Sequence, residues 1–202
     1  MPVLVRTSFD RVWYKSLVSI VTKGGDTGET GLLYGGRVPK DDLHTEAYGA
    51  LDEAISALGL ARSLDTDETR AARILELQRE LFIVGAELAT GKGERHHLEQ
   101  HFSVVTESMV EALHAWVREI EGRVALPQSF VIPGGSPTAA ALDLARTFVR
   151  RAERRAVALH RAGELENSEV LRYLNRCSDL LFMLAREAEH GATVPTGGHR
   201  KR

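Results

Sequence analysis

The sequence predicts an all-α protein, a bundle of five long helices formed by a single domain. Apolar residues recur every three or four positions in five separate segments, and stretches that contain proline or glycine divide these segments. No segment has the convincing alternation of apolar and polar residues that marks a strand. The chain has 202 residues, 43% of them hydrophobic, which is enough to bury a full core.

The first two helices are expected over residues 43–63 and 67–90. The first carries an apolar face made by Tyr48, Leu51, Ile55 and Leu58. The second carries one made by Ile74, Leu77, Leu81, Val84 and Leu88. Asp65 or Thr66 is the expected N-cap of the second helix, because either side chain can accept a hydrogen bond from a free backbone N–H.

The other three helices are expected over residues 103–122, 137–162 and 167–190. The third has apolar residues at Met109, Leu113, Trp116 and Ile120. Pro137 is favoured in the first turn of the fourth helix, and Gly163 ends that helix. The fifth has its apolar face at Val170, Leu174, Cys177, Leu181 and Leu184.

Composition excludes several classes of protein. A formal net charge of −2 argues against a broadly basic nucleic-acid binder. The single cysteine, Cys177, rules out an internal disulfide and a cysteine-cluster zinc site, and it is expected to be a small buried residue of the fifth helix. No apolar run is long enough to span a bilayer, so no membrane partner is expected.

The histidines between the second and third helices are a weak candidate for a metal site. His97 and His101 have ligand spacing for a helix, but the adjacent His96 and His97 would point apart on one. Gly91 and Gly93 indicate a loop here. We therefore predict a solvated polar loop and no metal ligands from the protein.

Both ends of the chain differ from the bundle at residues 21–190. Residues 1–20 carry Arg6, Arg11 and Lys15 against Asp10, and charge interrupts the apolar residues throughout, which excludes a secretory signal. We expect a mobile or strand-like N-terminal extension of a cytoplasmic protein, with a transit peptide as the alternative. The short basic tail at residues 191–202 is expected to be disordered.

One segment of the fourth helix is rich in arginine. "RTFVRRAERR", Arg146 to Arg155, holds five arginines and one acid, Glu153, and Arg146, Arg150 and Arg154 share a face. A solvated charged face is one interpretation. An anion site is the other, because one acid cannot neutralise five arginines and the guanidinium fork suits phosphate oxygens.

A second segment suited to anions lies before the first helix. "TKGGDTGETG", Thr22 to Gly31, offers glycines that let backbone N–H groups converge, threonine hydroxyls and Lys23, and Lys40 follows it. Alone, this segment fits a flexible surface loop at least as well. Together with the arginines it suggests a polyphosphate ligand, most plausibly a nucleotide.

Six segments in register resemble one family, the ATP:cob(I)alamin adenosyltransferases of the propanediol-utilisation (PduO) type. In order, they are "TKGGDTGETG", "RVPKDD", "YGALDE", "FVIPGGSPTAAALDLART", "RRAERR" and "YLNRCSDLLF". The resemblance covers about residues 20–190. It departs at Val21, where the family usually has tyrosine, and at Gly24, where threonine or asparagine is common.

The resemblance implies a homotrimer with active sites between subunits. It implies that ATP is surrounded in one subunit by Thr22, Lys23, Gly24, Gly25, Thr30, Gly31 and Lys40. It implies that the neighbouring subunit completes the site with Arg150, Arg151, Glu153, Arg154 and Asn175. Asp52 and Arg146 match a salt bridge between subunits, and Phe130 matches an aromatic residue beneath the corrin ring. Ordinary core packing is the alternative for Phe130.

The chemistry that the resemblance implies needs no nucleophile from the protein. Co(I) of reduced cobalamin attacks the 5′ carbon of ATP, inorganic triphosphate leaves, and adenosylcobalamin forms. Asp52, Arg146, Arg154 and Phe130 are the expected catalytic residues, with Mg²⁺ bridging the triphosphate. A reductase and an acceptor enzyme that uses adenosylcobalamin are expected partners. The alternatives are a regulatory nucleotide-binding bundle without catalysis and a scaffold whose arginines only pair between subunits.

Overall fold

The computed structural model describes residues 21, 23–126, 129–189, 191 and 194–195. Thr22, the N-terminal extension at residues 1–20 and most of the tail therefore lie outside the described residues. The described part of the chain contains six helices: α1 (Leu43–Leu64), α2 (Glu68–Leu88), α3 (Arg95–His101), α4 (Glu107–Glu121), α5 (Pro137–Arg161) and α6 (Glu169–Ala188). None of these helices is both long and apolar enough to cross a bilayer.

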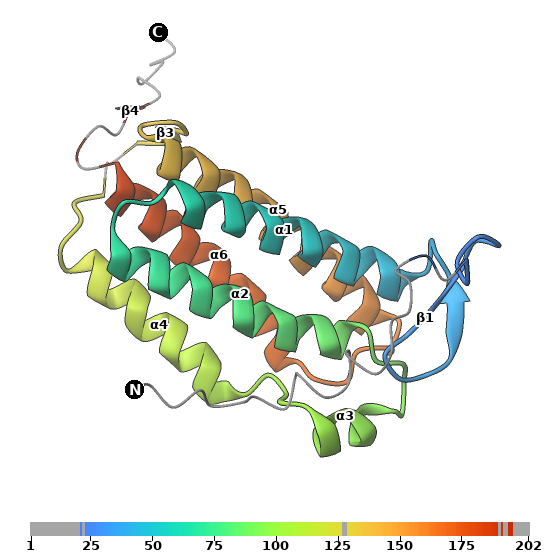
Figure 1. The fold of residues 1–202 in the computed structure, drawn as a ribbon. Coiled ribbons are helices and arrows are strands. Elements are labelled where there is room, and N and C mark those ends of the chain that lie inside the picture. Colours follow the sequence, from blue (N-terminus) through green and yellow to red (C-terminus); the bar gives the residue numbers. More distant parts are fainter. Residues whose placement is uncertain (1–20, 22, 127–128, 190, 192–193, 196–202) are drawn as a thin grey trace, which may run out of the picture.

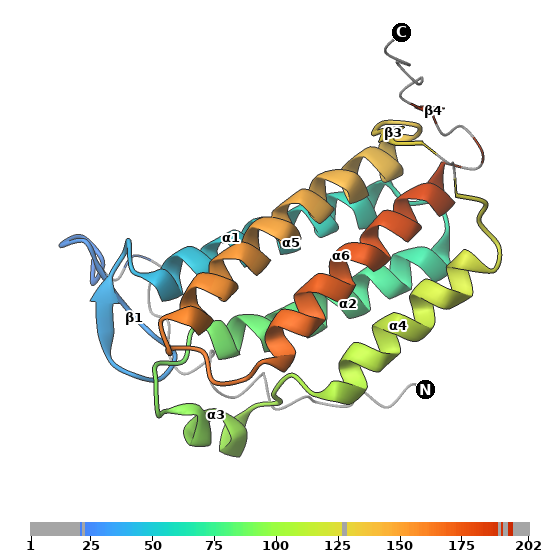
Figure 2. The same cartoon turned by 180° about the vertical axis from the view of Figure 1, so that it is seen from behind.

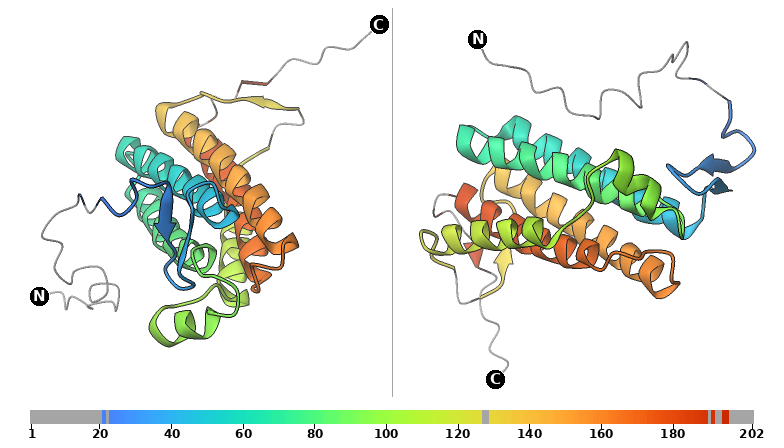
Figure 3. Two further views of the ribbon diagram at one scale, coloured as in Figure 1. Left: turned by 90° about the vertical axis from the view of Figure 1, so that its right-hand side faces the viewer. Right: turned by 90° about the horizontal axis from the view of Figure 1, so that it is seen from below.

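The long helices form a bundle with two opposite faces. Helices α1 and α2 lie side by side on one face (Figure 1), and α5 and α6 lie on the opposite face (Figure 2). Helix α1 packs closely against α5, and α4 packs against α6. The views in Figure 3 place a short β-hairpin at the end of the bundle where α1 begins.

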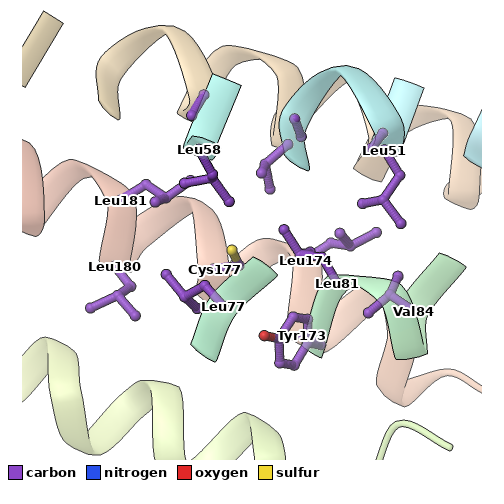
Figure 4. Close-up of a cluster of buried hydrophobic side chains, with 14 of the residues drawn as sticks. Leu51, Leu58, Leu77, Leu81, Val84, Tyr173, Leu174, Cys177, Leu180 and Leu181 are labelled. Carbon is purple, nitrogen blue, oxygen red and sulfur yellow. The ribbon is translucent and has the colours of Figure 1, made fainter. Parts of the chain in front are cut away.

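The core between the helices is built from the apolar faces that the spacing predicts. Leu51 and Leu58 of α1, Leu81 of α2 and Leu174 and Leu181 of α6 point toward one another in Figure 4, and each is at most 1% exposed. Full burial of one such side chain contributes about 1.5–3 kcal/mol to stability. Apolar residues recur every three or four positions along each of these helices, so burial of this core fixes which side of each helix faces inward.

One polar contact sits within this core. The Tyr173 hydroxyl of α6 donates a hydrogen bond to Glu80 Oε2 of α2 over 2.6 Å, and Tyr173 is fully buried. Burial raises the pKa of the Tyr173 hydroxyl and of the Glu80 carboxyl, which keeps the phenol protonated and able to donate. Cys177 is also buried on α6, as expected, and burial raises the pKa of its thiol.

The prediction of five long helices is confirmed, and the loop regions need correction. The segment expected to be a polar loop contains the seven-residue helix α3, on which the adjacent His96 and His97 rings lie 3.9 Å apart instead of diverging. Helix α2 is capped by Asp67, whose side chain accepts from Arg70 N, and not by Asp65 or Thr66. Asp65 instead pairs with the Arg70 guanidinium at 2.5 Å.

Four short strands were also not predicted, because strands of two or three residues are too short to show alternation. β1 (Glu29–Gly31) pairs antiparallel with β2 (Arg37–Pro39), with Thr30 opposite Val38. β3 (Val131–Ile132) pairs antiparallel with β4 (Val194–Pro195) at the other end of the bundle. β4 lies within the segment expected to be a disordered tail, the rest of which is largely outside the described residues.

Replacing Tyr173 tests the polar contact in the core. Tyr173→Phe leaves the partly buried Glu80 carboxylate without this donor, and we expect it to lower the free energy of unfolding by about 1 kcal/mol. Glu80→Gln keeps an acceptor oxygen and removes the charge, so it should cost less. Urea unfolding of both variants measures the difference, and equal stability of Tyr173→Phe and the parent would contradict the assigned role.

Candidate active site

The β1–β2 hairpin holds the glycine-rich segment against the start of α1. Its turn uses Gly35 and Gly36, whose φ angles are +110° and +88°. A Cβ on Gly35 would lie 2.9 Å from the Gly91 Cα, so the hairpin and the segment after α2 approach closely only because both residues lack side chains. Gly91 N also donates to the Tyr34 carbonyl over 2.8 Å.

Two lysines stand at the exposed edge of this hairpin. Lys23 precedes the glycine turn with a φ of +55°, and its side chain is exposed. The Lys40 Nζ lies so close to Gly25 that a Cβ there would be 3.0 Å away. Gly24 is held by its carbonyl, which accepts from Arg37 Nη2 over 2.7 Å. The turn thus places the Lys40 ammonium against the glycine backbone, with Lys23 exposed in the same segment, and such a combination suits an anion.

Beside the hairpin, α1 and α2 form an apolar pocket of about 760 Å³. Gly31, Tyr48 and Asp52 lie along it, and the rest of the lining is mainly apolar: Leu32, Leu33, Leu51, Ile55, Leu81, Phe82, Gly85, Ala86, Ala89 and Phe102. Phe82 is 51% exposed at this pocket.

The apolar surroundings raise the pKa of two polar groups of the pocket, Asp52 and Tyr48. Loss of hydration raises the pKa of the Asp52 carboxyl. Burial also raises the pKa of the Tyr48 hydroxyl, against the opposing effect of a hydrogen bond with Thr30. Among the described residues, no lysine or arginine lies within ion-pair distance of Asp52. Asp52 is therefore a carboxylate at an apolar surface that still lacks a cationic partner.

The arginine segment of α5 divides between two faces of that helix. Arg151 pairs with Glu53 and Arg155 with Glu46, at 3.1 Å for the second pair, so both turn toward α1. Counting acids within the segment was therefore a poor guide, because α1 supplies two more. Arg150 and Arg154 are exposed, and neither forms an ion pair with another described residue.

Arg146, Arg150 and Arg154 share the face of α5 that borders α6. The Arg146 Nε lies 3.7 Å from Asp143 Oδ1, and the guanidinium carbon is 5.9 Å from the centroid of the Phe182 ring on α6. Glu153 accepts from Asn175 Nδ2 of α6 over 3.0 Å. The Nε–H of Arg146 is buried and has no hydrogen-bond acceptor among the described residues. This face is cationic and incompletely paired.

A buried ion cluster that the sequence analysis did not predict lies next to Arg146 and shares Asp143 with it. Arg186 Nη2 of α6 donates to Asp143 Oδ2 over 2.5 Å and to Glu189 Oε1 over 2.9 Å, and all three residues are buried. The Arg186 guanidinium also lies 5.0 Å from the centroid of the Phe182 ring. Two features of the sequence could have indicated this cluster: Arg186 stands among the apolar residues of α6, and Asp143 stands three residues before Arg146.

Phe130 is not part of the core. It is 86% exposed and directly precedes β3, where Ile132 is 49% exposed. Core packing is therefore wrong as an explanation for Phe130. The three residues from Phe130 to Ile132 form an apolar surface at the end of the bundle away from the hairpin (Figure 1).

The structure does not bring all the predicted residues together in one chain. Gly31 and Asp52 line the pocket between α1 and α2, and Thr30 hydrogen-bonds to Tyr48 of that lining. Lys23, Gly24, Gly25 and Lys40 belong to the adjoining hairpin segment. Arg146, Arg150 and Arg154, with Glu153 and Asn175, lie on the α5–α6 face. These surfaces belong to α1–α2 and to α5–α6, which lie on opposite faces of the bundle (Figures 1 and 2), and the carboxylate near Arg146 in its own chain is that of Asp143 and not that of Asp52.

Comparison with known proteins identifies relatives over nearly the whole chain. A family model described as cobalamin adenosyltransferase matches residues 20–188. The corrinoid adenosyltransferase of Bacillus subtilis (strain 168) is 41% identical over 175 residues, covering 84% of this chain and 86% of the relative. That of Mycobacterium leprae (strain TN) is 39% identical over 181 residues, covering 88% and 95%.

Solved structures of adenosyltransferases have the same fold as this chain. One is a variant PduO-type ATP:corrinoid adenosyltransferase from Lactobacillus reuteri complexed with cobalamin and ATP. It has a TM-score of 0.78 and 34% sequence identity, covering 85% of this chain and 91% of that one. A second variant from the same organism, complexed with ATP, has a TM-score of 0.76 and 35% identity, covering 85% and 94%.

Replacing Arg186 tests how much the buried ion cluster next to Arg146 contributes to stability. Arg186→Met removes the guanidinium that donates hydrogen bonds to the buried carboxylates of Asp143 and Glu189, and we expect a loss of about 3 kcal/mol in the free energy of unfolding. Arg172→Met is the matched control on the same helix, because Arg172 pairs with Glu169 on the exposed side and should leave stability almost unchanged. Equal denaturation midpoints of the two variants would contradict this contribution.

Proposed function

Because the chain belongs to the cobalamin adenosyltransferase family, it is an enzyme of ATP-dependent adenosyl transfer to a corrinoid, and we propose that two copies of the chain form each active site. The hairpin and pocket face of one copy contributes one half. The arginine face of the next copy contributes the other. The observation that carries this proposal is the position of these two incomplete surfaces on opposite faces of one bundle.

The groups on the two faces complement each other. Asp52 is a carboxylate at an apolar surface that forms no ion pair with another described residue, and Arg146 is a partly exposed cation whose ion-pair contact in its own chain is the 3.7 Å approach to Asp143. Contact between unlike faces of identical chains is head-to-tail, and such contacts close into rings when the rotation allows it. A trimer is the ring that we propose, with one Asp52–Arg146 pair at each interface.

The triphosphate of ATP would lie between the two faces. Lys23 and Lys40 and the glycine turn approach it from one side, and Arg150 and Arg154 approach it from the other. Neutralising charge as it builds on the leaving triphosphate lowers the barrier, and loss of one such donor commonly costs about 3 kcal/mol. Arg151 and Glu153 would position this surface through their contacts with Glu53 and Asn175.

Mg²⁺ fits this site as a companion of ATP. The described residues hold one cluster of three carboxylate or histidine ligands, and it lies on α3 and not at the hairpin. Since Mg²⁺ is usually bound through substrate phosphates and water with few protein ligands, the triphosphate oxygens would carry it. Its contribution is neutralisation of phosphate charge, while the protein's lysines and arginines orient the chain of phosphates.

The transfer step itself balances without a protein nucleophile. The electron pair of Co(I) forms the cobalt–carbon bond at the 5′ carbon of ATP, and the carbon–oxygen bond breaks with its electrons going to triphosphate. The protein holds these atoms in line and excludes water. Phe130 would lie beneath the corrin ring and displace the lower cobalt ligand, which makes Co(II) easier to reduce. Its 86% exposure supports this role, because a ligand-facing aromatic must be accessible in the free chain.

The cytoplasmic location stays a prediction from the N-terminal sequence. The reductase that supplies the electron and the enzyme that receives adenosylcobalamin stay predictions from the family resemblance.

Mixing two inactive variants tests the shared site. Asp52→Ala damages only the pocket half, and Arg154→Ala damages only the arginine half, so each variant alone should lose most of its turnover. In assemblies mixed at equal amounts, an interface has an intact pocket half with probability one half and an intact arginine half with probability one half. About a quarter of the sites should therefore regain activity, measured by the absorbance change of adenosylcobalamin formation.

The control for this experiment is Arg155→Ala. Arg155 is adjacent to Arg154 but pairs with Glu46 of its own chain, so the variant should keep most of its turnover. If mixed assemblies of Asp52→Ala and Arg154→Ala stay inactive although both variants exchange chains, the shared site is wrong.

Phe130→Ala tests the role of the exposed aromatic. We expect the variant to slow the reaction at least about tenfold when it starts from Co(II), because the lower ligand is no longer displaced. Starting from preformed Co(I), the loss should be much smaller. The rate of adenosylcobalamin formation is measured once from Co(II) and once from preformed Co(I). Equal slowing of both rates in the variant would contradict a role in Co(II) reduction.

A further inference from the structure

Three residues at the start of α3 bring together the ligand types of a transition-metal site. The carboxylate of Glu94 and the imidazoles of His96 and His97 each have a ligand atom within 4.8 Å of the others. The His97 Nε2 lies 3.6 Å from Glu94 Oε2, and the two imidazole centroids are 3.9 Å apart. The edges of a tetrahedral zinc site are about 3.4 Å long, so small rotations of these accessible side chains would close the set.

A hydrogen bond fixes the orientation of one imidazole. His96 Nδ1 lies 3.0 Å from the Gly93 carbonyl oxygen, so this nitrogen carries the proton and donates it. The Nε2 lone pair of His96 is then left for a metal. Metal-binding histidines almost always donate their other N–H to a carbonyl or carboxylate in this way, which sets the tautomer and strengthens the ligand.

The backbone that carries the three ligands is held in place by the rest of the protein. Gly93 adopts a φ of +78°, and its N–H donates to Glu166 Oε1 over 3.0 Å. The His97 ring lies 5.8 Å from the ring of Tyr34, a residue between β1 and β2. The ligands therefore stand on an ordered turn, so binding an ion needs little further ordering of the chain.

We propose that Glu94, His96 and His97 bind a divalent transition-metal ion of the Zn²⁺ type, with a fourth position left to water. Two imidazoles and one carboxylate suit Zn²⁺, Co²⁺ or Ni²⁺, whereas Mg²⁺ and Ca²⁺ prefer sites made of oxygen alone. His101 is not a member of the cluster, although its spacing from His97 was the original signal. The ion would link the three side chains at the start of α3. Because the His97 ring lies against Tyr34, it would also stabilise the position of the hairpin.

Titration of the tag-free full-length chain with Zn²⁺ tests this site. We expect one equivalent to bind per chain by calorimetry, and Co²⁺ to give the visible absorption of a four-coordinate ion. His97→Ala should weaken Zn²⁺ binding at least about tenfold, and Glu94→Gln should weaken it by a smaller factor. All readouts are taken without ATP or cobalamin, so they do not depend on the proposed active site.

A matched control separates the cluster from ordinary histidines, of which the chain has eight. His114 lies 3.8 Å from Glu111 Oε2 on α4 in a comparable histidine–glutamate pair without a third ligand. His114→Ala should bind Zn²⁺ as the parent does. Circular dichroism confirms that each variant is folded. The site is excluded if the parent binds no Zn²⁺, or if folded His96→Ala/His97→Ala keeps the stoichiometry and affinity of the parent.

Discussion

Burial of helix α6 is the constraint on which the rest of the structure depends. Its residues pack against α5, α4 and α2, and most of its length is buried. The buried side of such a helix can carry polar groups only where a neighbouring segment supplies a partner. Tyr173 therefore meets Glu80 of α2, and Arg186 meets Asp143 of α5. The first contact fixes α6 against α2, and the second fixes α6 against α5, the helix that carries the arginine segment.

The arginines of α5 divide between a face that pairs with α1 and a face that is exposed. Arg151 and Arg155 face α1 and are neutralised there by glutamates, which helps to fix the α1–α5 contact. Arg150 and Arg154 are one position earlier in each case, about 100° around the helix, and so they face solvent beside α6. The net charge of the chain conceals this separation, because the positive and negative groups balance in total but not on each face.

The sequence predicted the parts of the fold that repeat and missed the parts that depend on contacts between distant residues. Leucines such as Leu51 and Leu81 recur with the helical period, so the five long helices followed directly. Helix α3 has seven residues and one buried side chain, Leu98, which is too little to give a periodic signal. The Arg186–Asp143 pair and the glutamate partners of α5 join segments far apart in the chain, and no local pattern reports them.

The candidate site was predictable to a similar extent. Motif resemblance named residues on both surfaces, and the structure describes all of them except Thr22. Resemblance alone did not reveal that Arg151 is held by Glu53, or that Phe130 is so exposed. Both facts require the packed helices, because exposure and pairing are properties of the fold and not of the residue type.

The state of Asp52 in the free chain bears on how the copies would associate. Loss of hydration raises the pKa of its carboxyl before any partner is present. In the proposed interface the Arg146 guanidinium would stabilise the ionised form and lower that pKa again. Association then releases a proton from the fraction of Asp52 that is protonated, so it is favoured as the pH rises and weakened as the pH falls through the raised pKa. The apolar pocket thus partly dehydrates the Asp52 carboxylate, and in the proposed interface the neighbouring arginine would offset this loss of hydration.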